Sequence, residues 1–161
     1  MSIKSAVEKL GFTLPPPPPP AADYLVTRHG ASGYFISGQL PKVEGGGLLA
    51  TGKVGGTVDL DTARACARQC VLNALSAMDA EWGDRFEDSF KRVLKLSVFV
   101  SSTPDFTDQH LVADGASALI HEVLGSAGRH ARAAVGCVSL PLDAPVEVEM
   151  IVEFVERADH G

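Results

Sequence analysis

Two residues in the last third of the chain have side chains suited to chemistry on a small acid. Arg132 follows a glycine and a histidine and leads into an apolar stretch. Its planar guanidinium can bind a carboxylate through two parallel hydrogen bonds, although a surface arginine would give the same pattern. Glu147 lies in an alternating segment, and a partly enclosed carboxylate can orient and deprotonate a water molecule. An ordinary exposed strand residue is the alternative, so both residues are candidates.

Other patterns that could support chemistry are weak in this sequence. His110 and Asp114 have the spacing of two ligands on one helix face, but no third ligand is evident. Gly45-Gly-Gly47 lacks the strand, the helix and the lysine of a phosphate-binding loop. Cys66 and Cys70 lie on the apolar side of an expected helix, where free cysteine behaves as a small hydrophobe. These residues therefore predict neither a metal site nor a phosphate-binding loop.

The composition is that of one globular unit. The chain has 161 residues, of which 45% are hydrophobic and 21% charged, enough to form a core without disulfides. The net charge of −6 opposes binding to nucleic acid or to an anionic membrane. The three cysteines form no CxxC pair, and neither a membrane-spanning run nor a secretory signal is evident. We expect a cytoplasmic protein that binds neither nucleic acid nor membrane.

The N-terminal segment has its own pattern. Residues 2–10 have the apolar spacing of a short amphipathic helix. The run Pro15–Pro20 predicts a stiff polyproline II segment, which could bind an aromatic groove or serve as a spacer. No basic residue flanks the run to set a binding direction, so the spacer is favoured. We expect residues 1–21 to be an N-terminal helix and a peripheral strut that holds this helix against the domain, residues 22–156 to be the domain, and 157–161 to be a polar tail. Deletion of residues 1–20 is expected to leave the core folded.

Hydrophobic periodicity predicts the elements that would position Arg132 and Glu147. Apolar residues at intervals of three and four indicate helices, and alternation indicates strands. In the longest strand, Leu94 and Leu96 are expected to share the buried face. The order predicts an α+β fold with two helices covering one face of the sheet. The expected strands cover residues 24–29, 34–37, 90–100, 133–138 and 146–155, and the expected helices cover about 59–82 and 107–124.

The last expected strand suggests what lies on the opposite face. Glu147, Glu149 and Glu153 share that face with Ile151 and Val155. A face that mixes carboxylates with apolar side chains often contacts another subunit. We therefore expect an oligomer.

Three motifs resemble the RidA/YjgF family of imine and enamine deaminases. Ile36-Ser-Gly-Gln-Leu-Pro41 resembles that family's SGQxP segment, and the stretch from Ala131 to Pro141 resembles its ARxxVxVxxLP signature. Pro145-Val-Glu-Val-Glu149 resembles its VEIE strand at the usual distance from the arginine. The likeness spans residues 22–155. The N-terminal helix and proline strut identify the chain as a member of a longer subgroup.

The resemblance implies a trimer with a chorismate-mutase-like fold, in which three sheets form a central barrel and a small site lies at each subunit interface. It implies that Arg132 binds the carboxylate of a small metabolite and that Glu147 positions the water that attacks the imine carbon. The products would be a 2-keto acid and ammonia, with no metal or organic cofactor. The implied substrate-binding positions are Tyr24, Ser37, Gly38 and Ala134.

Two positions depart from the usual deaminases of the family. Ala134 stands where they carry cysteine, at a position that offers mostly its backbone, and Pro104 stands where they carry asparagine. The change at Pro104 removes an amide contact to substrate. Hydrolysis of another small carboxylated C–N or acylated compound therefore stays open, as does a non-catalytic trimeric binder or sensor of small carboxylates. Ribonuclease activity, also attached to the family, is opposed by the acidic pI of about 5.3.

Overall fold

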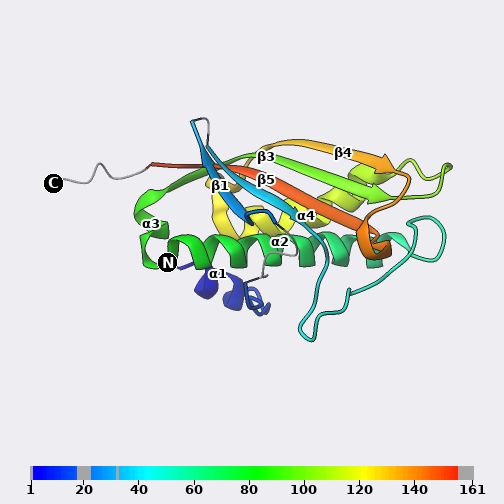
Figure 1. Ribbon diagram of the computed structural model, residues 1–161, viewed down its shortest axis with the longest axis horizontal. Coiled ribbons are helices and arrows are strands. Elements are labelled where there is room, and N and C mark those ends of the chain that lie inside the picture. Colours follow the sequence, from blue (N-terminus) through cyan, green and yellow to red (C-terminus); the bar gives the residue numbers. More distant parts are fainter. Residues whose placement is uncertain (1, 18–22, 32, 156–161) are drawn as a thin grey trace.

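The computed structural model describes residues 2–17, 23–31 and 33–155. This part of the chain forms one five-stranded sheet with two long helices, α2 and α4, on one of its faces (Figure 1). Within it, no helix has the length and apolar character needed to cross a bilayer. The strands are β1 (Thr27–Gly30), β2 (Gly33–Gln39), β3 (Phe90–Ser101), β4 (Ala131–Cys137) and β5 (Val146–Phe154), and the helices are α1 (Ile3–Lys9), α2 (Leu60–Trp82), α3 (Phe86–Ser89) and α4 (Gln109–Leu124).

The sheet is mixed, with the strand order β1-β2-β5-β3-β4. Only β3 and β4 are parallel neighbours among these strands. A parallel pair needs a crossover, and α4 supplies it. The crossover brings the carboxyl ends of β3 and β4 to the same edge, near the start of α4 (Figure 1). The predicted α+β class and the two helices on one face are confirmed.

Helix α2 begins and ends where its sequence predicts. The Asp59 side chain accepts a hydrogen bond of 2.7 Å from the backbone N–H of Thr62, which stabilises the first turn. The same contact lowers the pKa of Asp59. Alternate residues of β5, including Val148 and Met150, lie on the helix-facing side with almost no exposure. Burial of this apolar face is the main source of stability that the fold offers.

The alternation predicted for β3 is wrong at Leu94. Val93 pairs with Val152 and Lys95 pairs with Ile151, which are adjacent on β5, so Leu94 is the extra residue of a β-bulge. Before the bulge, the side chains of β3 therefore point to the opposite face from the one that strict alternation with Leu96 predicts. Val93 is buried and Leu94 only half-buried.

The N-terminal helix is not peripheral. Ile3 and Val7 of α1 are buried and belong to the main core, beneath α2 (Figure 1). Beyond α1, the Ser76 hydroxyl on α2 donates a hydrogen bond of 2.6 Å to the carbonyl of Pro15. Removing this segment would expose apolar surface, so α1 is part of the core, and folding of the core without residues 1–20 stays a prediction. Residues 18–20 of the proline run lie outside the described residues.

Asn73, a buried polar residue of α2, ties the helix to the segment that follows β2. Its Nδ2 donates to the carbonyls of Leu40 and Lys42 at 2.8 and 3.1 Å, and its Oδ1 accepts from Gln69 at 3.1 Å. We expect Asn73→Ala to lower the free energy of unfolding by about 1–3 kcal/mol, because two partly buried carbonyls lose their donor. Urea unfolding followed by circular dichroism measures this. Gln69→Ala is the control and should cost about 1 kcal/mol or less; equal losses would contradict the assignment.

Candidate functional site

Glu147 lies on the open face of the sheet, the face that α2 and α4 leave uncovered. It pairs with Phe99 on β3, and Phe99 pairs with Val135 on β4. Residues that pair directly across strands point to the same face. Val135 is 47% exposed and Phe35, further along this face, is 41% exposed. The Glu147 carboxylate is therefore set among apolar side chains.

The surroundings of Glu147 change its acidity. Partial burial raises the pKa of the carboxyl, and the negative charge of Glu149 on the same face raises it further. A carboxylate with a raised pKa is a stronger base, which suits it to accept a proton from water. A carboxylate of this kind is chemically able to accept a proton from water, and its role in a reaction stays a prediction.

Gly38 lies against the Glu147 carboxylate. A Cβ at this position would lie 1.9 Å from the Glu147 Oε1, so any larger residue would displace the carboxylate. The contact arises because the pairing of β2 with β5 shifts register between Ile36 and Gln39. The structure therefore brings together two of the residues predicted for the site.

The other predicted pocket residues are more dispersed. Ser37 donates both its hydroxyl and its backbone N–H to the carbonyl of Val26, at 3.1 and 2.9 Å, next to β1. Tyr24 is exposed in the segment before β1. Ala134 pairs with the buried Val98, so it points toward the helices and away from the face of Glu147.

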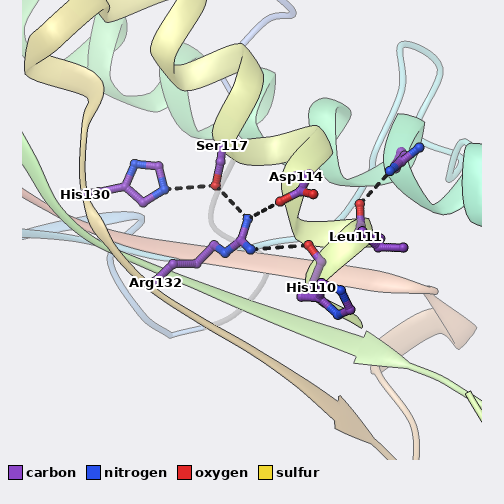
Figure 2. Close-up of polar contacts among 7 residues, drawn as sticks. His110, Leu111, Asp114, Ser117, His130 and Arg132 are labelled. Carbon is purple, nitrogen blue, oxygen red and sulfur yellow. Dashed lines mark hydrogen bonds and ion pairs between the residues drawn. The ribbon is translucent and has the colours of Figure 1, made fainter. Parts of the chain in front are cut away.

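Arg132 also points toward the helices. It pairs with Leu96, which is buried in the core. Its guanidinium reaches α4, where Nη1 donates to Asp114 Oδ1 at 2.8 Å and to the Ser117 hydroxyl at 3.1 Å (Figure 2). Nη2 donates to the carbonyl of His110 at 3.3 Å. Three of the five guanidinium N–H groups are used within the described residues, which leaves Nε and one hydrogen of Nη2 for a ligand.

His130 completes the network around Arg132. Its Nδ1 lies 2.6 Å from the carbonyl of Gly128, and because a carbonyl only accepts, Nδ1 carries the proton. In the neutral ring Nε2 then accepts from the Ser117 hydroxyl at 3.0 Å (Figure 2). Ser117 thus accepts from Arg132 and donates to His130. This chain of hydrogen bonds fixes the orientation of the guanidinium.

The sequence did not predict the role of Asp114. The spacing of Asp114 from His110 indicated at most a weak pair of metal ligands, whereas the structure makes Asp114 the ion-pair partner of Arg132. No group of three or more His, Cys, Asp or Glu side chains in residues 2–17, 23–31 and 33–155 is arranged to hold a metal ion.

Arg132 and Glu147 lie on opposite faces of the sheet. Arg132 shares the helix-facing side with Leu96, whereas Glu147 shares the open face with Phe99. One chain therefore does not present both side chains to one small molecule. A site that uses both needs a second chain.

Comparison with known proteins agrees with this architecture. The family described as Endoribonuclease L-PSP matches residues 18–154. "Protein TCP17" of Trypanosoma cruzi is 44% identical over 153 residues, which are 94% of each chain. The structure of Atu1372 from Agrobacterium tumefaciens, of unknown function, is 43% identical with a TM-score of 0.85, over 95% of this chain and 94% of that one. The structure of a Shewanella oneidensis protein, provisionally assigned as an endoribonuclease, is 25% identical with a TM-score of 0.88. The match covers 95% of this chain and 99% of that one. The α+β fold is thus the predicted chorismate-mutase-like one, and the chain belongs to the endoribonuclease L-PSP family, which is the RidA/YjgF family.

Proposed function

We propose that this protein hydrolyses small 2-imino or 2-enamino acids to 2-keto acids and ammonia. The observation that supports this most directly is the Glu147 carboxylate, which is partly buried against Gly38 and has a raised pKa. Arg132 supports it from the other side, since part of its guanidinium edge is left for a carboxylate.

In the proposed reaction, each group has one task. Arg132 holds the substrate carboxylate, which fixes the imine carbon near Glu147. Glu147 takes a proton from water as the water oxygen bonds to the carbon of the protonated imine. That proton is then passed to the nitrogen of the tetrahedral intermediate. The C–N bond then breaks and ammonia leaves, while Glu147 accepts the remaining hydroxyl proton and the carbon becomes the carbonyl of the 2-keto acid.

We propose that the site forms between subunits of a homotrimer. Arg132 and Glu147 of one chain face opposite ways, and the open face carries exposed apolar side chains at Phe35 and Val135. We expect light scattering at micromolar concentration to give about three times the chain mass of 16.9 kDa. Val135→Asp should shift the protein toward monomer and lower the rate in parallel. A wild-type monomer would contradict the interface site.

The proposed activity can be tested on imines made in place. An amino-acid oxidase generates 2-imino acids, and semicarbazide traps the imine that survives. The wild-type protein should lower the trapped signal across at least part of a panel of amino acids. If it lowers none of them, deamination of common imines is wrong for this protein.

Ribonuclease activity, which the family description names, is less well supported by this chain. The net charge is −6, and the open face carries Glu147, Glu149 and Glu153. These charges repel the phosphate backbone instead of releasing its counterions.

A further inference from the structure

A cavity of about 500 Å³ opens at the edge of the sheet where β3 and β4 end and α4 begins. Part of its lining is polar and includes an ammonium group, a side-chain amide and hydroxyl groups. The part most relevant to ligand binding comprises Lys53, Ser102, Thr103, Gln109, Gly136 and Cys137. Arg132 does not line the cavity, whereas Pro104 does, at the position where the family's deaminases carry asparagine.

Lys53 gives the cavity its positive charge. Its Nζ donates to the carbonyl of Val138 and, at 3.4 Å, to the Ser101 hydroxyl. An ammonium has three N–H donors, so one is left for a ligand. Among the described residues, no carboxylate forms an ion pair with Lys53. A half-buried cation without an ion-pair partner among these residues favours an anionic ligand.

Gln109 and Gly136 shape the wall beside this charge. Gln109 Nε2 donates to the carbonyl of Phe106 at 2.7 Å and to the Ser102 hydroxyl at 3.3 Å. Since Ser102 acts there as acceptor, its own O–H can donate to a ligand oxygen. A Cβ at Gly136 would lie 3.0 Å from Gln109 Nε2 and 3.1 Å from the Ser102 oxygen. Glycine therefore keeps this polar wall open.

The Lys53 ammonium lies on the same face as Glu147. Ser101, which Lys53 contacts, is two residues beyond Phe99 on β3, and alternate strand residues share a face. Cys137 pairs with Ser101 and therefore also lies on this face. Burial raises the pKa of the Cys137 thiol, and two nearby charges also act on it: Lys53 lowers this pKa and Glu147 raises it. The cationic cavity and the proposed base are thus close neighbours within one chain.

We propose that the cavity around Lys53 binds a second carboxylate, so that the substrate is a 2-imino acid with an acidic side chain. Glu147 would act at the imine carbon while the side-chain carboxylate accepts hydrogen bonds from Lys53 and Ser102. This assignment of the substrate rests on the proposed function. Binding of the dicarboxylate by the cavity does not require turnover.

Titration calorimetry on the full chain tests this with two keto acids, 2-oxoglutarate as the dicarboxylate and 2-oxobutanoate as the monocarboxylate. We expect 2-oxoglutarate to bind at least about tenfold more tightly, a difference of about 1.4 kcal/mol, because its second carboxylate gains a charge-assisted hydrogen bond. Lys53→Met should remove that preference and leave 2-oxobutanoate unchanged. Lys91→Met, an exposed lysine at the far end of β3, is the matched control and should change neither. Equal binding of the two acids by the wild type, or an unchanged preference in Lys53→Met, would overturn the proposal.

A second measurement needs no variant, since Lys53 also holds Val138 and its loss could disturb the loop. N-hydroxysuccinimidyl acetate acetylates lysines, and mass spectrometry of peptides reports each site. 2-Oxoglutarate should protect Lys53 and leave Lys91 reactive, and absence of protection would overturn the proposal. Protection without any imine turnover would support the cavity and refute the deaminase. The opposite result is also informative. If wild type and Lys53→Met hydrolyse monocarboxylate imines with the same kinetics, and neither prefers the dicarboxylate, the deaminase is supported and the dicarboxylate cavity is refuted.

Discussion

Replacing Arg132 by alanine is expected to lower kcat/KM for imine hydrolysis by about 100-fold or more. A charge-assisted hydrogen bond contributes about 1.5–3 kcal/mol, and two are lost when the guanidinium edge is removed. Every 1.4 kcal/mol corresponds to about a factor of ten. Because Arg132 fixes the substrate before and during the reaction, KM should rise as well. The oxidase and semicarbazide assay, run at several substrate concentrations, measures both effects.

Three variants distinguish the contribution of the Arg132 guanidinium to activity from that of its hydrogen-bond partners. Arg132→Lys keeps the charge but loses the fork, so its rate should lie between those of wild type and Arg132→Ala. Ser117→Ala removes one hydrogen bond to Arg132 and should cost only a few-fold. Arg85→Ala removes an exposed arginine near α3 and should have no effect. If Ser117→Ala is as inactive as Arg132→Ala, the network and not the guanidinium carries the effect.

Periodicity located the long elements because their faces differ strongly in polarity. Helix α2 has a continuous apolar side and a capping aspartate, so its limits at Leu60 and Trp82 follow from local chemistry. Leu94 could not be placed the same way. The alternation rule assumes two residues per repeat, and the bulge in β3 breaks that rule where no glycine or proline marks it.

The face of the sheet on which Glu147 lies can be inferred from its neighbours in sequence, whereas the face on which Arg132 lies cannot. Val146 and Val148 are buried, so Glu147 must point the other way. Around Arg132 the strand reads Ala131-Arg-Ala-Ala-Val-Gly-Cys137, where small residues on both sides give no clear polarity. Only the parallel pairing with β3 and the contact with Asp114 reveal its direction.

Lys53 could not be predicted as a binding residue from the sequence, for a different reason. It lies in the glycine-rich segment between β2 and α2, which has no hydrophobic period from which to infer its direction. Its partners Ser101 and Val138 are 48 and 85 residues away in the chain. A site assembled from such distant segments becomes visible only when the sheet pairing is known.

Glu147→Gln is expected to lower kcat by about 100- to 10,000-fold, the range that general acid–base groups contribute, with a smaller change in KM. Glutamine keeps the size of the side chain and its contact with Gly38 but cannot accept the proton from water. Glu153→Gln, on the same face and paired with Arg92, is the matched control and should keep most of the activity. A kcat within a few-fold of wild type in Glu147→Gln would refute the assignment.

The pH dependence and the stability of these variants give an independent check. Glu147 must be ionised to act as a base, and burial and Glu149 raise its pKa, so the rate should fall as the pH drops through that raised pKa. Glu149→Gln removes a nearby negative charge, lowers the pKa of Glu147 and should move the acid limb of the pH–rate profile to lower pH.

The raised pKa also predicts how Glu147 affects stability. A folded-state pKa above the unfolded value means that the ionised Glu147 carboxylate destabilises the folded state once the pH rises past the ordinary pKa of the group. Glu147→Gln should therefore unfold at the same or higher urea concentration than wild type at pH 7, and an inactive but clearly destabilised variant would indicate structural damage instead of a lost base.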